Sequence, residues 1–72
     1  MEKQFKDLLE LYREYIDIFN NWQFTKDEKK DNYNWTYLVR IFYNLTDILV
    51  DNNIIERYGI KHYKVIESGE II

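Results

Sequence analysis

Two long stretches of this sequence carry apolar residues at intervals of three and four positions, the spacing of one face of an α-helix. In the first stretch these residues are Phe5, Leu8, Leu9, Tyr12, Tyr15, Ile16, Phe19 and Trp22. Charged residues occupy most of the opposite side, so the pattern predicts an amphipathic helix over about residues 4–22. Such a helix has to bury its apolar stripe against a second element of the fold.

The second stretch supplies that element. Its apolar residues are Trp35, Leu38, Ile41, Phe42, Leu45, Ile48 and Leu49, which predict a central helix over about residues 35–51. Between the two stretches, residues 25–28 read Thr-Lys-Asp-Glu and fit a capping box, which favours a short helix over about residues 26–31. Asp31, Asn32 and Asn34 favour turns over helix interiors, so we expect a break before the central helix.

A different pattern follows residue 51. Asp51, Asn52 and Asn53 predict a helix stop, after which β-branched and aromatic residues lie on both sides of Gly59. This arrangement predicts a β-hairpin over about residues 54–66. The expected fold class is therefore α+β and mainly helical, with two long amphipathic helices, a short intervening helix and a C-terminal hairpin.

The length of the chain limits what else it can contain. Its 72 residues can enclose one hydrophobic core, so we expect a single domain over residues 1–72. Its 7 Tyr, 4 Phe and 2 Trp residues are more aromatic surface than such a core hides, which favours contact with a partner. The start of the chain, residues 1–6, leads directly into a charged amphipathic pattern, so we expect no membrane partner and a cytoplasmic location.

Residues suited to catalysis are scarce. There is no cysteine, His62 is the only histidine, and Ser68 is the only serine. Gly59 and Gly69 are the only glycines, so no phosphate-binding glycine loop is present. We therefore expect no catalytic residues, no metal site and no cofactor, and a protein that binds without being an enzyme.

The C-terminal half resembles the winged-helix family. The resemblance covers roughly residues 25–66 and is carried by the stretch 45–57, followed by residues 58–65 around Gly59. It implies a recognition helix and a wing, and hence a small DNA-binding transcriptional regulator as an alternative function. The residues that would contact nucleic acid are Thr36, Arg40, Tyr43 and Asn44 on the helix, and Arg57, Lys61 and Lys64 on the wing. The formal net charge of −3 opposes long-range attraction to DNA, so this alternative is the second choice.

Four carboxylates occupy one side of the first helix at intervals of three, four and three residues. This acidic row comprises Asp7, Glu10, Glu14 and Asp17. Repeated negative charge of this kind resembles phage anti-CRISPR proteins and other DNA-mimic inhibitors, which occupy the basic groove of a nucleic-acid enzyme. The composition, rich in Ile, Asn, Lys and Tyr, is typical of AT-rich coding DNA and favours a phage or mobile element as the source. The alternative interpretation is an ordinary solvated helix side.

Four apolar residues lie off the main stripes. Leu11 and Ile18 are seven residues apart on the first helix, a spacing that favours a homodimer contact. Tyr37 and Tyr43 lie off the main stripe of the central helix, where an amphipathic phenol suits an interface. The sequence thus predicts a non-enzymatic module that acts through protein–protein contacts, made by these residues or by the acidic row.

Overall fold

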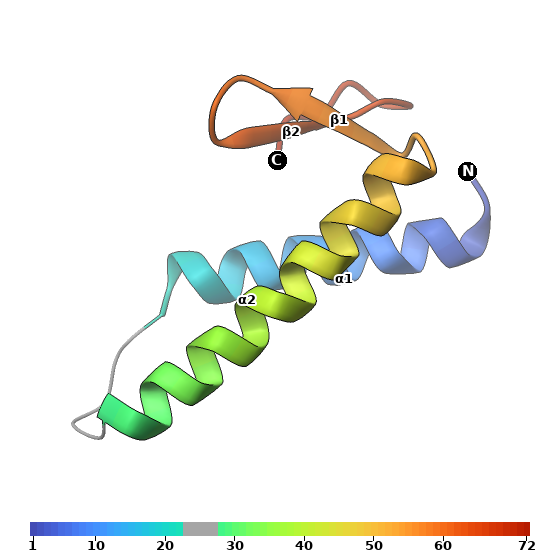
Figure 1. The fold of residues 1–72 in the computed structure, drawn as a ribbon. Coiled ribbons are helices and arrows are strands. Elements are labelled where there is room, and N and C mark those ends of the chain that lie inside the picture. Colours follow the sequence, from blue (N-terminus) through green and yellow to red (C-terminus); the bar gives the residue numbers. More distant parts are fainter. Residues whose placement is uncertain (23–27) are drawn as a thin grey trace.

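A computed structural model gives the fold of the chain (Figure 1). It describes the backbone of residues 1–22 and 28–72, and the side chains of residues 1–22 and 34–72. The order of elements is α1 (Lys3–Asn20), α2 (Glu28–Asp51), β1 (Ile55–Tyr58) and β2 (His62–Val65). The α+β class, the two long helices and the C-terminal hairpin are therefore as predicted.

The first helix ends two residues before the predicted limit. Asn21 caps it by donating from its backbone N–H and its side-chain amide to the carbonyl of Asp17, over 3.1 and 2.8 Å. Asparagine suits this position because its side chain can replace a lost helical hydrogen bond. Trp22 follows the cap and still packs on Trp35 of α2, with ring centroids 5.3 Å apart.

The separate short helix is not confirmed, and the predicted break is wrong. Residues 28–51 form one uninterrupted helix that begins before Asp31 and continues through Asn34. The penalty for Asp or Asn inside a helix is at most about 0.7 kcal/mol each, which packing of the apolar stripe on α1 readily offsets. Residues 26 and 27 of the predicted short helix, and residues 25–27 of the capping box, lie outside the described residues.

The stop predicted at residues 51–53 is confirmed. Asn53 adopts the left-handed conformation, with φ 58°. The N–H of Asn53 donates to the carbonyl of Val50 over 3.0 Å, and that of Ile54 donates to Leu49 over 2.9 Å. This pair of bonds is the Schellman motif, which satisfies carbonyls at the end of the helix and turns the chain into β1.

The hairpin is closed by a three-residue loop around Gly59, whose φ is 69°. Its strands are antiparallel, with Ile55 opposite Val65 at one end and Tyr58 opposite His62 at the other. Beyond β2 the chain turns at Gly69 (φ 76°) and runs back beside the hairpin. Ile72 exchanges two backbone hydrogen bonds with Tyr63, of 2.8 and 3.3 Å, so the tail extends the sheet as a third, strand-like segment.

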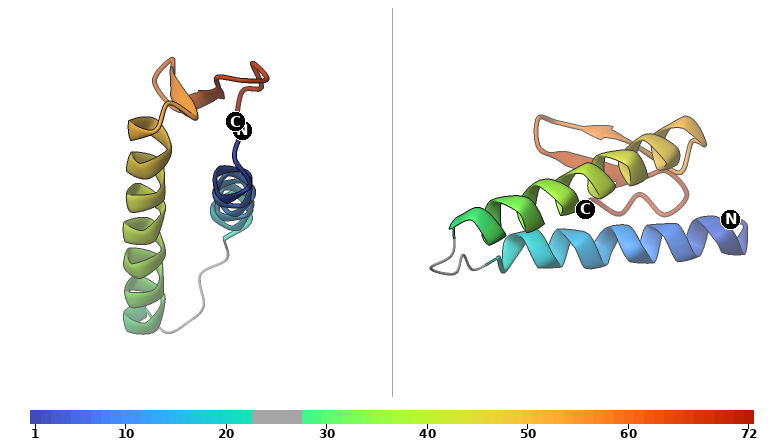
Figure 2. Two further views of the ribbon diagram at one scale, coloured as in Figure 1. Left: turned by 90° about the vertical axis from the view of Figure 1, so that its right-hand side faces the viewer. Right: turned by 60° about the horizontal axis from the view of Figure 1, so that its bottom comes forward.

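The core lies where the two helices and the hairpin meet. The helices cross one another, and the hairpin and tail lie on one side of the pair (Figures 1 and 2). The buried apolar residues come from both helices and both strands, and they are Leu9, Tyr12, Leu45, Leu49, Ile55 and Val65. The side chain of Tyr12 stacks on Phe42 at 4.7 Å between ring centroids and meets the edge of Tyr63 at 6.5 Å. Tyr12 therefore links α1 to both α2 and the sheet.

The buried side of α2 differs from the predicted stripe. Thr46 is 7% exposed, whereas Ile48, expected in the core, is 44% exposed. The helix is thus rotated so that Thr46 faces the protein interior. Burial of the threonine hydroxyl is tolerated because it donates to the carbonyl of Phe42 over 2.8 Å.

Candidate protein interface

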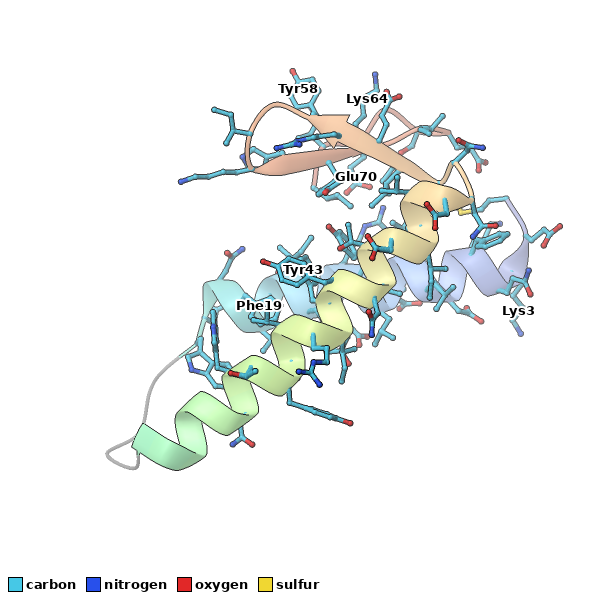
Figure 3. The ribbon with its side chains drawn as sticks, in the orientation of Figure 1. Lys3, Phe19, Tyr43, Tyr58, Lys64 and Glu70 are labelled. Atoms are coloured by element: carbon cyan, nitrogen blue, oxygen red, sulfur yellow. The ribbon has the colours of Figure 1, made fainter. Side chains whose placement is uncertain are left out.

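Each of the two helices has one side that the hairpin and tail cover and another side that they leave uncovered. On α1, Arg13 marks the covered side, because its guanidinium forms an ion pair with Glu70 of the tail. On α2, Thr46 marks it, because Thr46 hydrogen-bonds with Tyr12, which also contacts Tyr63 of β2. Figure 3 shows the side chain of Tyr43 on this same side of α2, in the space below the hairpin.

Leu11 and Ile18 lie on the uncovered side of α1. With about 100° between successive residues, both are rotated by about 140° to 160° from Arg13. They are 38% and 40% exposed. Leu8 and Tyr15, which are partly buried, complete a stripe with intervals of three, four and three residues. Because Leu8 and Tyr15 also pack against the core, the apolar surface of α1 extends from its core-facing stripe onto the uncovered side.

The second helix repeats this arrangement. Tyr37, Ile41 and Ile48 are rotated by about 140° to 180° from Thr46, so they face away from the hairpin. Tyr37 and Ile48 are 58% and 44% exposed, and Ile41 is partly buried. Asn44 lies between Ile41 and Ile48 and is the polar member of the stripe.

The two stripes together form one surface, here called the open face. Its members are Leu8, Leu11, Tyr15, Ile18, Tyr37, Ile41 and Ile48. In the right-hand view of Figure 2 the helix pair lies in front and the hairpin behind it. Among the described residues no strand, turn or tail segment covers the open face.

The contact residues predicted from sequence are thus divided. Leu11, Ile18 and Tyr37 meet on the open face, whereas Tyr43, 64% exposed, belongs to the opposite side. Sequence reasoning missed Ile41 and Ile48 as members of this surface and assigned them to the core. The spacing 37, 41, 44 and 48 is a signal that could have found them, because it is a second helical stripe beside the first.

Carboxylates border the open face on both edges. Asp7 and Glu14 follow its α1 edge, and Asp47 and Asp51 follow its α2 edge; all four are exposed. Among the residues whose side chains the structure describes, Arg40 is a cation on the α2 edge and Lys3 is one on the α1 edge. The described part of the border therefore carries net negative charge, which draws positively charged groups toward the apolar surface.

The acidic row is exposed along its whole length, but its members face two surfaces. Asp7 and Glu14 border the open face, whereas Glu10 and Asp17 turn toward the tail. Glu10 lines a shallow groove of about 680 Å³ between α1 on one side and the end of β2 with the segment after it on the other. Asp17 lines a smaller hollow of about 250 Å³ beside Arg13.

Two ion pairs involve residues that line the larger groove. Arg13 pairs with Glu70, and the amino group of Met1 lies 3.4 Å from a carboxylate oxygen of Glu67. Within residues 1–22 and 34–72 no three His, Cys, Asp or Glu side chains gather as a metal site would require. His62 is exposed at the start of β2 and does not line the groove, which Val65 lines at the other end of that strand.

The candidate nucleic-acid contacts occupy separate elements. Thr36, Arg40, Tyr43 and Asn44 are all exposed and span an arc of about 100° on α2, from Tyr43 on the covered side to Asn44 on the open face, and Asp47 lies in the same arc. The wing cations are Arg57, Lys61 and Lys64 on the hairpin. The ammonium of Lys64 lies 3.5 Å from the carboxylate of Glu56, which offsets its charge.

Comparisons with protein-family models, curated proteins and solved structures found no match to this chain. Over the described residues, neither helix combines the length and apolar character needed to cross a bilayer. The open face is therefore interpreted from its own geometry and chemistry.

Proposed function

We propose that this chain is a non-enzymatic binding module whose open face contacts another protein. The observation that carries the proposal is the set of apolar residues Leu11, Ile18, Tyr37 and Ile48, which lie beside the core-facing stripes and are each more than a third exposed. Apolar stripes at three-and-four spacing are buried in stable helical proteins, either inside the fold or against a partner.

The energetics support a contact made by these side chains. Full burial of a Leu or Ile side chain is worth about 1.5 to 3 kcal/mol. Leu11, Ile18 and Ile48 are each about two-fifths exposed, so a part of this free energy is still available to a partner. Tyr37 adds an aromatic residue of the type that often dominates binding energy.

A photo-crosslinking experiment tests this proposal. A photoreactive amino acid replaces Ile18 on the open face, and a matched protein carries it at Ser68, which is exposed near the tail. Irradiation in the cells that naturally contain the chain should give a discrete adduct with one protein from position 18 only. Adducts of equal yield from both positions, or none from position 18, would contradict a binding role for the open face.

The inhibitor version of the proposal assigns the partner to the nucleic-acid enzymes of a host. It is supported by the exposure of the acidic row and by a composition typical of phages and mobile elements. Charge reversal by Glu10→Lys and Glu14→Lys should then weaken inhibition of such an enzyme, because its basic groove would be repelled. Undiminished inhibition would remove this version and leave the open face as the contact.

The alternative is a DNA-binding regulator of winged-helix type. It is favoured by one observation, the exposure of Thr36, Arg40, Tyr43 and Asn44 within one arc of about 100° on α2. A gel shift with duplex DNA at low salt separates the two functions, because electrostatic attraction to phosphates is then strongest. We expect no shift, and a shift that Arg40→Glu abolishes would favour the regulator.

A further inference from the structure

We propose that the partner of the open face is an α-helix of another protein, with apolar residues on one side and lysine or arginine along both flanks. The inference rests on the proposed function, because it assigns an occupant to the same surface. Its basis is the shape of the open face, its acidic border, and what that border would do to a second copy of the chain.

The shape of the surface favours a helical occupant. Leu11 and Ile18 project from α1, Tyr37 and Ile48 project from α2, and partly buried residues such as Ile41 lie closer to the core. An added helix would place its apolar stripe between these two rows, as a third helix packs on a pair in a helical bundle. The groove and the hollow described above lie on the side of α1 that faces the tail, away from this surface.

Charge determines which kind of helix fits. The occupant's flanks would lie beside Asp7 and Glu14 on one edge and beside Asp47 and Asp51 on the other. Lysine or arginine at these flanking positions would form ion pairs, whereas glutamate there would be repelled. Arg40 and Lys3 offset only part of this preference, since four carboxylates among the described side chains border the face.

The same border disfavours a second copy. Two open faces meeting through a two-fold axis would bring the border of one chain against the border of the other, whichever helices faced each other. Carboxylates would then oppose carboxylates on both edges, and like charges at an interface lower affinity. The homodimer expected from Leu11 and Ile18 is therefore replaced by a contact with a basic helix.

Two synthetic three-heptad helical peptides provide the probe. Both carry leucine on one side, and the flanking positions are lysine in one and glutamate in the other. Fluorescence anisotropy at low salt should show the lysine peptide binding the full chain at least about tenfold more tightly than the glutamate peptide. Binding of the two peptides with equal affinity, or of neither, would overturn the inference.

Variants on the open face test where the peptide binds. Leu11→Asp with Ile18→Asp should weaken lysine-peptide binding by about tenfold or more, since both residues lie at the centre of the α1 stripe. Ile60→Asp with Ile66→Asp is the matched control on the hairpin, where the two side chains are 88% and 43% exposed. Equal losses in both variants would overturn the assignment, and circular dichroism confirms that each variant is folded.

A charge swap tests the role of the border. Asp7→Lys with Glu14→Lys should bring the affinities of the two peptides together, because it removes the negative α1 edge. Glu10→Lys with Asp17→Lys makes the same change in net charge on the side toward the tail, and should have a clearly smaller effect. Equal effects of the two swaps would show that total charge matters and the border does not, which overturns the inference.

Sedimentation of the protein alone separates this inference from the proposed function. We expect a monomer at low salt. A dimer that Leu11→Asp with Ile18→Asp dissociates would overturn the basic-helix assignment and make the occupant a second copy. The photo-crosslinking at position 18 would still decide independently whether the open face binds another protein.

Discussion

Asn53 controls how the chain leaves α2. Among the described non-glycine residues it alone has a positive φ, and the two Schellman hydrogen bonds depend on that conformation. The left-handed conformation costs most L-residues about 1 to 2 kcal/mol of conformational free energy, and the cost is lower for Asn and for the achiral Gly. Ile54, the next residue, then packs against the core.

Substitution at this position should separate backbone geometry from side-chain chemistry. Asn53→Val should destabilise the fold by about 1 to 2 kcal/mol, because a β-branched residue resists positive φ. Asn53→Gly should change stability by less than about 0.5 kcal/mol, since easier turning is offset by a more flexible unfolded chain. Urea unfolding followed by circular dichroism measures both, and Asn44→Val within α2 serves as the control. Equal effects of Val at positions 53 and 44 would contradict this role.

Tyr12 is buried in the core, where it contacts side chains of both α2 and β2. It is 1% exposed, and burial raises its pKa above the usual 10.0. The hydrogen bond with Thr46 lowers the pKa and the nearby phenol of Tyr63 raises it, but burial has the largest effect. The folded protein therefore holds Tyr12 in its neutral form to higher pH than the unfolded chain does.

This pKa difference predicts a loss of stability in alkali. Because the folded-state pKa is raised, the contribution of neutral Tyr12 is complete below about pH 10 and declines as the pH rises beyond it. Tyr12→Phe should cost about 0.5 to 1.5 kcal/mol at neutral pH through the lost hydrogen bond, yet reduce the decline above pH 10. Thermal unfolding at a series of pH values tests this. An equally steep decline in Tyr12→Phe would assign the effect to other tyrosines.

At the level of elements, α2 shows where local sequence signals lose to packing. Asp31, Asn32 and Asn34 argue for a turn when each is weighed alone, but residues 28–51 share one helix. Trp35 illustrates the compensation, since it packs on Phe19 and Trp22 of α1 with centroid distances of 5.1 and 5.3 Å. If the chain broke before residue 35, Trp35 would stand at the first position of a shorter helix, and its packing on α1 would have less support from the backbone.

Proline at position 34 distinguishes a continuous helix from a broken one. In the interior of α2, Asn34→Pro should destabilise the fold by about 3 kcal/mol, because it removes a helical hydrogen bond and clashes with the preceding turn. A chain with a turn at residues 31–34 would tolerate it. Asn34→Ala is the control and should be neutral or mildly stabilising. The measurement is tryptophan fluorescence during urea unfolding, and tolerance of the proline would contradict the continuous helix.

Both long helices, the stop after residue 51 and the hairpin could be predicted because each has a local cause. The stripe of α1 predicted its buried side, and Gly59 predicted the turn of the hairpin. The rotation of α2 could not be predicted, because it depends on the side from which the hairpin covers the helix. Thr46 and Ile48 exchange places for that reason, although an apolar stripe favours the isoleucine as the buried residue.

At the scale of the molecule, the position of the hairpin also limits how much of the open face can be predicted from the sequence. Leu11, Ile18 and Tyr37 were recognised individually, since each lies off its main stripe. That they share one surface, and that Tyr43 does not, follows only from the way the helices cross and from the position of the hairpin. The acidic border joins residues of both helices and is likewise a property of the assembled fold.

The whole molecule is thin, with extents of 42, 24 and 16 Å along its principal axes. A fold of this size gains little more than about 3 to 5 kcal/mol from its single core. Phe42 is therefore critical, because its ring joins Tyr12 and Phe19 of α1, at centroid distances of 4.7 and 5.2 Å.

Adjacent aromatic residues on α2 provide a matched test of this marginal stability. Phe42→Ala should remove about 3 to 5 kcal/mol, which is enough to unfold the chain at room temperature. Tyr43→Ala, one position further on, should change stability by less than about 0.5 kcal/mol, because its side chain is 64% exposed. Circular dichroism and thermal unfolding distinguish the two. If Phe42→Ala still unfolded cooperatively near the wild-type temperature, stability would have to come from outside this core. A partner helix on the open face stabilises only the folded state, so it should restore helicity to variants of intermediate stability.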